Sequence, residues 1–120
     1  MTINILNGYQ SGWDKGHYIG RAGKGRKGSA LANPFKLVNA EDSAQRAWVI
    51  QRYREWLWQQ IQASNPVVIN ELLLLKKQAE EGDLNLLCFC APRPCHGNVI
   101  KSCVEWLILS DNSSAGDVRN

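Results

Sequence analysis

The 120-residue sequence lacks the features that would place it in or across a membrane. Its longest leucine cluster, Leu72–Leu75, is far too short to span a bilayer, so we expect no membrane partner. The first residues, Met1–Ile5, do not join a basic segment to an apolar one, so no signal peptide is expected. We therefore expect a cytoplasmic protein whose four cysteines are free thiols.

Internal repeats are also absent, and no linker is long enough to divide the chain. An apolar fraction of 44% and a charged fraction of 21% are those of an ordinary globular protein. The length is typical of one domain, which can bury a core without disulfides. We predict a single domain over residues 1–110, followed by a flexible polar tail over residues 111–120.

Hydrophobic patterning predicts three strands and three helices. The strands are Ile3–Leu6, His17–Ile19 and Leu84–Cys90, of which the last is an almost continuous apolar run typical of a strand buried on both faces. The first helix begins at Asp42 or Ser43, ends near Ala63, and places Ala47, Ile50, Tyr53, Leu57 and Ile61 on its buried face. The second covers Pro66 to about Glu81, with a strand at Leu72–Leu75 as the alternative, and the third runs from near Cys95 to about Leu109.

This order predicts an α/β fold: a small mixed or parallel sheet of about three to four strands with three helices packed on it. Ligands of such sheets bind beyond the carboxyl ends of the strands. One loop follows the His17–Ile19 strand and another turn follows the Leu84–Cys90 strand. If these strands run parallel, the loop and the turn meet at one edge of the sheet.

Acidic residues are missing between Lys15 and Lys36, where six of the fourteen basic residues lie. The centre of this stretch, Gly20–Gly28, is called the glycine loop here. Glycines let backbone N–H groups face an anion, while arginine and lysine add charge. The loop is not a Walker A motif, because Ser29-Ala30 follows Gly28 in place of the required lysine and hydroxyl residue. We favour an anionic ligand over a merely solvated loop, and the predicted ligand-binding residues are Tyr18, Gly20, Arg21, Lys24, Arg26, Asn33 and Arg93.

The most specific stretch, Cys88–Gly97, is called the Cys-His turn. One interpretation is thiol chemistry: a helix start lowers the pKa of Cys95, and His96 or His17 is its proton partner, which makes Cys95 and His96 the candidate catalytic residues. A second is zinc held by Cys88, Cys90, Cys95 and His96, which is not favoured because the Cys-x-Cys spacing is tighter than usual. A third is structural: Cys88, Cys90 and Cys103 are small core residues, as we expect above all for Cys103, while Cys95 and His96 cap the helix and contact the ligand without chemistry. No cofactor is favoured, and zinc is the one that the side chains would suit.

Four pieces of the chain carry a resemblance to a known family: Tyr18–Arg21, Asn33–Phe35, the Tyr53–Leu57 part of the first helix, and Leu87–Gly97. In these pieces the chain resembles an uncharacterised bacterial and phage family, domain of unknown function 4326. The Cys-His turn alone is also similar to domain of unknown function 488. The resemblance implies no activity, but it implies that the glycine loop, the Asn33–Phe35 turn and the Cys-His turn belong to one shared feature.

The leading functional hypothesis is a binding domain for a nucleotide or another phosphorylated small ligand. Arg21, Lys24 and Arg26 would hold phosphate, Asn33 would hydrogen-bond the ligand, and Cys95 with His96 would lie at the reacting end if the protein is an enzyme, which stays open. The alternative is a nucleic-acid-binding module, with or without a structural zinc, in which Trp13 or Tyr18 stacks on bases. A protein-interaction adaptor that uses exposed tryptophans is a third possibility.

Overall fold

Three parallel strands form one open sheet in the computed structural model, which describes residues 2–23, 25–35, 38–39, 41–91 and 93–117 and side chains as far as Ser110. The strands are β1 (Thr2–Asn7), β2 (His17–Tyr18) and β3 (Asp83–Cys88), in the spatial order β1-β3-β2. The α/β class and the small sheet of about three strands are therefore confirmed, and the sheet is parallel throughout.

The three strands end at the same edge of the sheet. Asn7 pairs with Cys88 and Tyr18 with Leu87, so the last residues of all three strands are neighbours in the register. We call this edge the carboxyl edge. The glycine loop follows β2 and the Cys-His turn follows β3, so the two segments meet there, as the sequence predicted for parallel strands.

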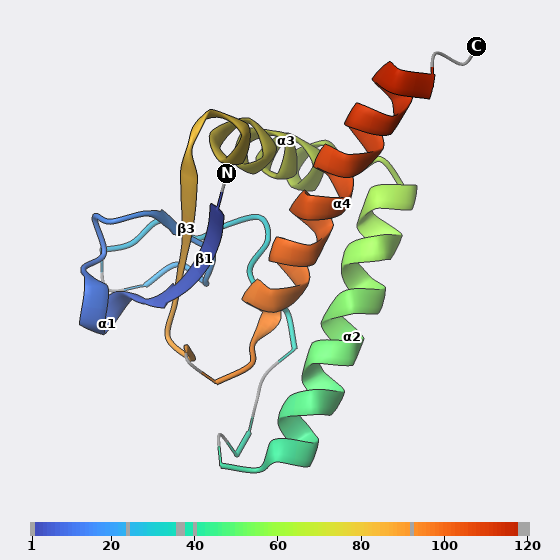
Figure 1. Ribbon diagram of the computed structural model, residues 1–120. Coiled ribbons are helices and arrows are strands. Elements are labelled where there is room, and N and C mark those ends of the chain that lie inside the picture. The colour runs from blue at the N-terminus through green and yellow to red at the C-terminus, as the bar shows by residue number, and fades with distance from the viewer. Residues whose placement is uncertain (1, 24, 36–37, 40, 92, 118–120) are drawn as a thin grey trace.

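Helices cover one side of this sheet. The long ones are α2 (Ser43–Gln62), α3 (Pro66–Glu81) and α4 (His96–Asp117). Figure 1 shows α4 between the sheet and α2, with α3 lying across one end of the layers. The side chains of Asp42 and Asn65 cap α2 and α3 by accepting bonds from backbone N–H groups, and Pro66 occupies the first turn of α3. No helix among the described residues is long and apolar enough to cross a membrane.

The core lies between β3, the three long helices and the segment that follows β2. Its largest fully buried side chains are Ile19, Leu31, Tyr53, Leu72, Leu75, Leu86, Ile100 and Val104. Leu72 and Leu75 face this core from α3, so the leucine cluster is helical and the strand alternative is wrong. Ile19 and Leu31 flank the glycine loop, and their burial fixes both of its ends to the core.

Several elements differ from the prediction. A short helix that was not predicted, α1 (Gly8–Ser11), follows β1, and the side chain of Asn7 caps it. β3 ends at Cys88 rather than Cys90, because β1 offers no residue beyond Asn7 and the side-chain amide of Asn7 instead bonds the carbonyls of Phe89 and Ala91. α4 continues to Asp117 rather than ending near Leu109, since each further residue of an established helix adds a backbone bond at little cost.

The predicted buried face of α2 is confirmed at Tyr53 and Leu57, and Ile50 and Ile61 pack against the core, but the first turns of the helix differ from the prediction. Arg46 and Val49 are buried, whereas Ala47 is exposed. Apolar spacing alone selected Ala47, but Arg46 lies three residues before Val49 and seven before Tyr53, in register with the buried face. A buried arginine therefore faces the interior near the carboxyl edge.

Candidate functional site

A cavity of about 410 Å³ opens at the carboxyl edge, between the glycine loop and the Cys-His turn. This volume is within the range of roughly 300–1,000 Å³ common for small-molecule sites. Its walls are formed by Tyr9, Tyr18, Gly20, Arg21, Ala22, Gly23, Arg26, Asn33, Phe35, Phe89, Cys90 and His96. Two guanidinium groups and no carboxylate line it among the described residues, so the cavity favours an anion.

Aromatic rings make one wall of the cavity. Tyr9, Trp13, Tyr18 and Phe89 form a connected cluster, with ring centroids 5.0–5.8 Å apart in edge-on or tilted contacts. The short α1 places Tyr9 there, and Phe89 follows β3 directly. Tyr9 is 64% exposed and Phe89 is 43% exposed, so these two rings offer open surface to a ligand.

Arg26 lies on this aromatic cluster. Its guanidinium carbon is 4.2 Å from the ring centroid of Trp13, 5.2 Å from that of Phe89 and 5.4 Å from that of Tyr18. These are cation–π distances, so the aromatic rings hold the positive charge of Arg26 at the cavity wall. The Nε atom of Arg26 is buried and has no hydrogen-bond partner among the described residues.

A contact between Arg21 and Asn33 ties the glycine loop to the segment that follows it. The Nε and Nη2 atoms of Arg21 donate to the backbone carbonyl of Asn33 over 3.0 and 2.6 Å. The Oδ1 atom of Asn33 accepts from the N–H of Phe35 over 2.9 Å, which fixes the Asn33–Phe35 turn. Among the described residues, Nη1 of Arg21 and Nδ2 of Asn33 remain as donors for a ligand.

Two backbone amides of the glycine loop are paired within the loop. Gly23 and Arg26 exchange N–H to carbonyl bonds of 3.1 and 2.8 Å around Gly25, whose φ of 79° favours glycine. The N–H of Ser29, just after the loop, donates to the carbonyl of Gly20. These three amides are therefore not directed at a ligand.

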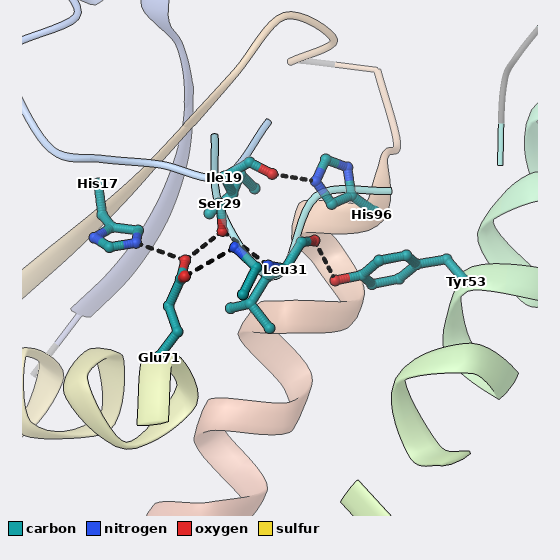
Figure 2. A network of polar contacts seen from close by, with 8 residues as sticks. His17, Ile19, Ser29, Leu31, Tyr53, Glu71 and His96 are labelled. Carbon is teal, nitrogen blue, oxygen red and sulfur yellow. Dashed lines mark hydrogen bonds and ion pairs between the residues drawn. The ribbon is translucent and has the colours of Figure 1, made fainter. Parts of the chain in front are cut away.

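Two side chains, Glu71 and Tyr53, hold the segment that leads out of the glycine loop, and their polar contacts are drawn in Figure 2. Glu71 of α3 accepts from Ser29, from the backbone N–H of Ala30 over 3.0 Å and from His17 over 2.9 Å. On the opposite side, the hydroxyl of Tyr53 donates to the carbonyl of Leu31 over 2.7 Å. The segment is thus held between α3 and α2.

Charge and burial set the ionisation of these anchors. Burial alone would raise the pKa of Glu71, but the bonds from His17, Ser29 and Ala30 outweigh it and hold the pKa below its ordinary value. Glu71 is therefore a carboxylate at neutral pH. Burial raises the pKa of Tyr53, so its hydroxyl remains a donor to the Leu31 carbonyl.

His96 is hydrogen-bonded to Ile19, the residue just before the glycine loop, and its imidazole is neutral. Its Nε2 atom is 2.8 Å from the carbonyl of Ile19, which can only accept, so Nε2 carries the hydrogen (Figure 2). Burial lowers the pKa of His96, and the charge of nearby Arg21 acts in the same direction. The other ring nitrogen, Nδ1, is then an unprotonated acceptor in a side chain that lines the cavity.

Three thiols gather at the Cys-His turn, beside the cavity. Cys95 caps the start of α4: its sulfur accepts from the N–H of Gly97 over 3.3 Å, and its own N–H donates to Oδ1 of Asn98 over 2.9 Å. The sulfur atoms of Cys95 and Cys88 are 3.7 Å apart. Cys88 and Cys95 are buried, whereas Cys90 is half-buried and lines the cavity.

The cluster changes which thiol ionises. The neighbouring Cys95 thiol lowers the pKa of Cys88 and that of Cys90 to about 6, although burial opposes the shift in both, and Arg46 contributes further at Cys90. The Cys88 sulfur and then the Cys90 sulfur, together with burial, raise the pKa of Cys95. The predicted lowering of the Cys95 pKa by the helix start is therefore wrong, because the N–H of Gly97 is outweighed by its two thiol neighbours.

A smaller cavity of about 60 Å³ lies beside the first and shares Asn33, Cys90 and His96 with it. Arg46 and Cys95 line this smaller cavity. Arg46 is only 8% exposed, and its Nη1 atom donates to the carbonyl of Pro94 over 2.9 Å. A buried guanidinium thus stands next to the thiol cluster.

Six predicted site residues line the main cavity together: Tyr18, Gly20, Arg21, Arg26, Asn33 and His96. Cys95 lies behind it, against the smaller cavity. Arg93 does not line it: it pairs with Glu41 over 3.0 Å and borders a different hollow beside β1. Lys24 lies outside the described residues.

Of the two predicted proton partners of Cys95, His17 bonds Glu71, whereas His96 lines the smaller cavity together with Cys95. The Nε2 atom of His96 is occupied by the Ile19 carbonyl, which leaves Nδ1 as its acceptor. Among the described side chains, no group of three or more histidine, cysteine or acidic residues has the geometry to hold a metal ion. What remains at the Cys-His turn is a thiol cluster beside an arginine.

Sequence reasoning missed Tyr9, Phe89 and Arg46. Tyr9 and Phe89 each follow the end of a parallel strand by one or two residues, which is the position from which ligand contacts are expected. Arg46 was detectable as a charged residue at the spacing of the buried face of α2. These three signals were present in the sequence.

The fold and the cavity define a small parallel α/β domain with a ligand-sized site at the carboxyl edge of its sheet. The sequence model of one family, described as domain of unknown function (DUF4326), matches residues 6–106. The chain belongs to this family, as the resemblance implied. No curated protein and no solved structure matches the chain.

Proposed function

We propose that the protein binds a nucleotide, or a similar small ligand that joins a phosphate to a planar ring, in the cavity at the carboxyl edge. The observation that carries this proposal is the composition of the cavity: two guanidinium groups, open aromatic rings and no carboxylate among its described lining residues. Guanidinium groups bind phosphate, and aromatic faces bind the ring.

The ligand would lie with its phosphate at the glycine loop and its ring on the aromatic wall. Nη1 of Arg21 and the guanidinium of Arg26 face the anion, and Nδ2 of Asn33 donates to it or to the adjoining sugar. The exposed rings of Tyr9 and Phe89 provide the stacking surface. Nδ1 of His96 accepts a hydrogen bond from a ligand hydroxyl or amino group.

A thermal-shift screen tests the proposal with nucleoside monophosphates, the matching nucleosides, sugar phosphates and inorganic phosphate. At a concentration one hundred times Kd, a ligand of the folded state adds about 2.7 kcal/mol. We expect nucleotides to raise Tm most, nucleosides less and inorganic phosphate least.

Two arginine variants localise the effect. Arg21→Ala removes a cavity cation, whereas Arg54→Ala removes an arginine from an exposed position on α2 that lines a separate groove. The nucleotide shift should disappear in Arg21→Ala and persist in Arg54→Ala. If no phosphorylated ligand raises Tm of the wild-type protein, while Arg21→Ala still folds, the proposal is wrong. Binding of oligonucleotides alone, with affinity that falls steeply with salt, would support the nucleic-acid alternative instead.

A further inference from the structure

The thiol cluster at the Cys-His turn contains one sulfur that reagents can reach and two that they cannot. Cys90 lines both the main cavity and the smaller one beside it. Cys95 is only 4% exposed and Cys88 only 2%. An electrophile that enters the cavity therefore meets Cys90 first.

We propose that Cys90 and Cys95 form a dithiol site that exchanges with disulfides, in which Cys90 attacks and Cys95 resolves the intermediate. The substrate class is a low-molecular-weight disulfide small enough to enter the cavity at the carboxyl edge. This activity is separate from the proposed ligand binding, because it depends on sulfur chemistry rather than on phosphate recognition.

The surroundings of Cys90 favour its thiolate. Cys90 lines the smaller cavity together with Cys95 and the buried guanidinium of Arg46, and the neighbouring thiol and the charges of Arg46 and Arg93 all favour the ionised form of Cys90. A thiolate is the form that attacks disulfides. The pKa of Cys90, at about 6, agrees with this geometry.

The exchange proceeds in two balanced steps. The Cys90 thiolate attacks one sulfur of the disulfide, a new sulfur–sulfur bond forms, the original one breaks, and one thiolate leaves. Cys95 then gives its proton to that thiolate and attacks Cys90, which forms the Cys90–Cys95 disulfide and releases the second thiolate. The protein dithiol is oxidised, and the small disulfide is reduced to two thiols.

The position of Cys95 suits the second step. It lines the smaller cavity together with Cys90, and its sulfur accepts from the N–H of Gly97 at the start of α4. The neighbouring Cys88 and Cys90 sulfurs, together with burial, hold the proton on Cys95 before the first step. When Cys90 becomes a neutral mixed disulfide, its part of this effect is gone, so the proton leaves Cys95 more readily.

Cys103 provides a control thiol in the same protein. It is also half-buried, but burial raises its pKa to about 11. At pH 7 the thiolate fractions of the two residues differ by roughly ten-thousandfold, and the lower nucleophilicity of the more acidic thiol reduces this to roughly a hundredfold in rate. Brief treatment of the native protein with iodoacetamide should therefore label Cys90 about a hundred times faster than Cys103, as measured by peptide mapping.

Incubation with oxidised glutathione tests the resolving step by intact mass. The wild-type protein and the Cys103→Ser variant should lose two hydrogen atoms and release two glutathione molecules. Cys95→Ser should stop at a mixed disulfide on Cys90, and Cys90→Ser should do neither. Cys88→Ala should still form the internal disulfide, which distinguishes the Cys90–Cys95 bond from one between Cys88 and Cys95.

Four results would overturn the proposal. The first is equal labelling of Cys90 and Cys103 in the wild-type protein, and the second is glutathione uptake by Cys90→Ser. The third is a folded Cys88→Ala variant that does not form the disulfide. The fourth is a stoichiometric zinc ion in the wild-type protein that is lost in Cys90→Ser. The labelling measurement needs no variant, so it decides the reactivity of Cys90 even if a substitution prevents folding. A failure of nucleotide binding leaves all these readouts unchanged.

Discussion

Replacement of Glu71 by glutamine is expected to loosen the glycine loop from the core. The carboxylate accepts from three groups on the segments around the loop, at His17, Ser29 and Ala30. Its side chain is 16% exposed, so water replaces these contacts only in part. Glutamine has nearly the same shape, but one of its two terminal atoms is a donor, so at least one of the three contacts is lost or reversed.

The cost follows from the kind of bond that is lost. Hydrogen bonds to a charged group contribute about 1.5–3 kcal/mol each, and a neutral amide recovers some of this. We therefore expect Glu71→Gln to lower the free energy of unfolding by about 2 kcal/mol. For a domain of this size, that corresponds to a fall in Tm of roughly 8 °C.

Glu80→Gln is the matched control, because it makes the same substitution on the same helix. Glu80 forms an exposed pair with Lys76 over 3.0 Å, four residues apart on α3. Such pairs contribute about 0.3–0.5 kcal/mol. Thermal and urea unfolding of the two variants, followed by circular dichroism, should therefore separate them by more than 1 kcal/mol.

The pH dependence has a definite sign. The pKa of Glu71 is lowered in the folded protein, so its stabilisation is complete above the unfolded pKa of about 4.3 and is lost as the pH falls through the folded value. The difference between the wild-type protein and Glu71→Gln should shrink below about pH 4. An equal loss in Glu71→Gln and Glu80→Gln, or a difference that grows in acid, would refute this account of the anchor.

Three further substitutions test other parts of the structure. Tyr53→Phe leaves the buried carbonyl of Leu31 without its donor and should cost about 1–3 kcal/mol in urea unfolding, while a stability equal to wild type would show that water replaces the hydroxyl. Gly8→Ala places a methyl group against the ring of Trp13 and should cost about 1–3 kcal/mol and reduce the near-ultraviolet circular dichroism of the aromatic cluster, which an unchanged spectrum would contradict. Arg93→Ala should leave nucleotide affinity unchanged, because Arg93 borders a different hollow, and a large loss of affinity would place that residue back in the site.

The sequence was sufficient for the fold and for much of the cavity wall. The sequence predicted a mixed or parallel sheet, and the parallel arrangement brings the glycine loop and the Cys-His turn to one edge. Arg21 and His96 were expected together in that case, and the family resemblance added Asn33; all three line the main cavity.

Local chemistry was less predictable, because it depends on contacts between segments far apart in the chain. The helix start suggested an acidic Cys95, but its neighbours Cys88 and Cys90 reverse that effect in the folded protein. In the first turn of α2 the buried side chain is Arg46, whereas apolar spacing selected its exposed neighbour Ala47. Ionisation depends on three-dimensional neighbours, which the order of residues does not specify.

Mapping a nucleotide titration onto the backbone amides by NMR is the most direct test of the central claim, that the cavity at the carboxyl edge holds a phosphorylated ligand. Addition of a nucleoside monophosphate should shift the amide signals of Gly20, Arg21, Asn33 and His96, and should leave those of the groove around Trp58 and Trp106 unchanged. Shifts confined to that groove, or no shifts at millimolar nucleotide, would contradict the claim.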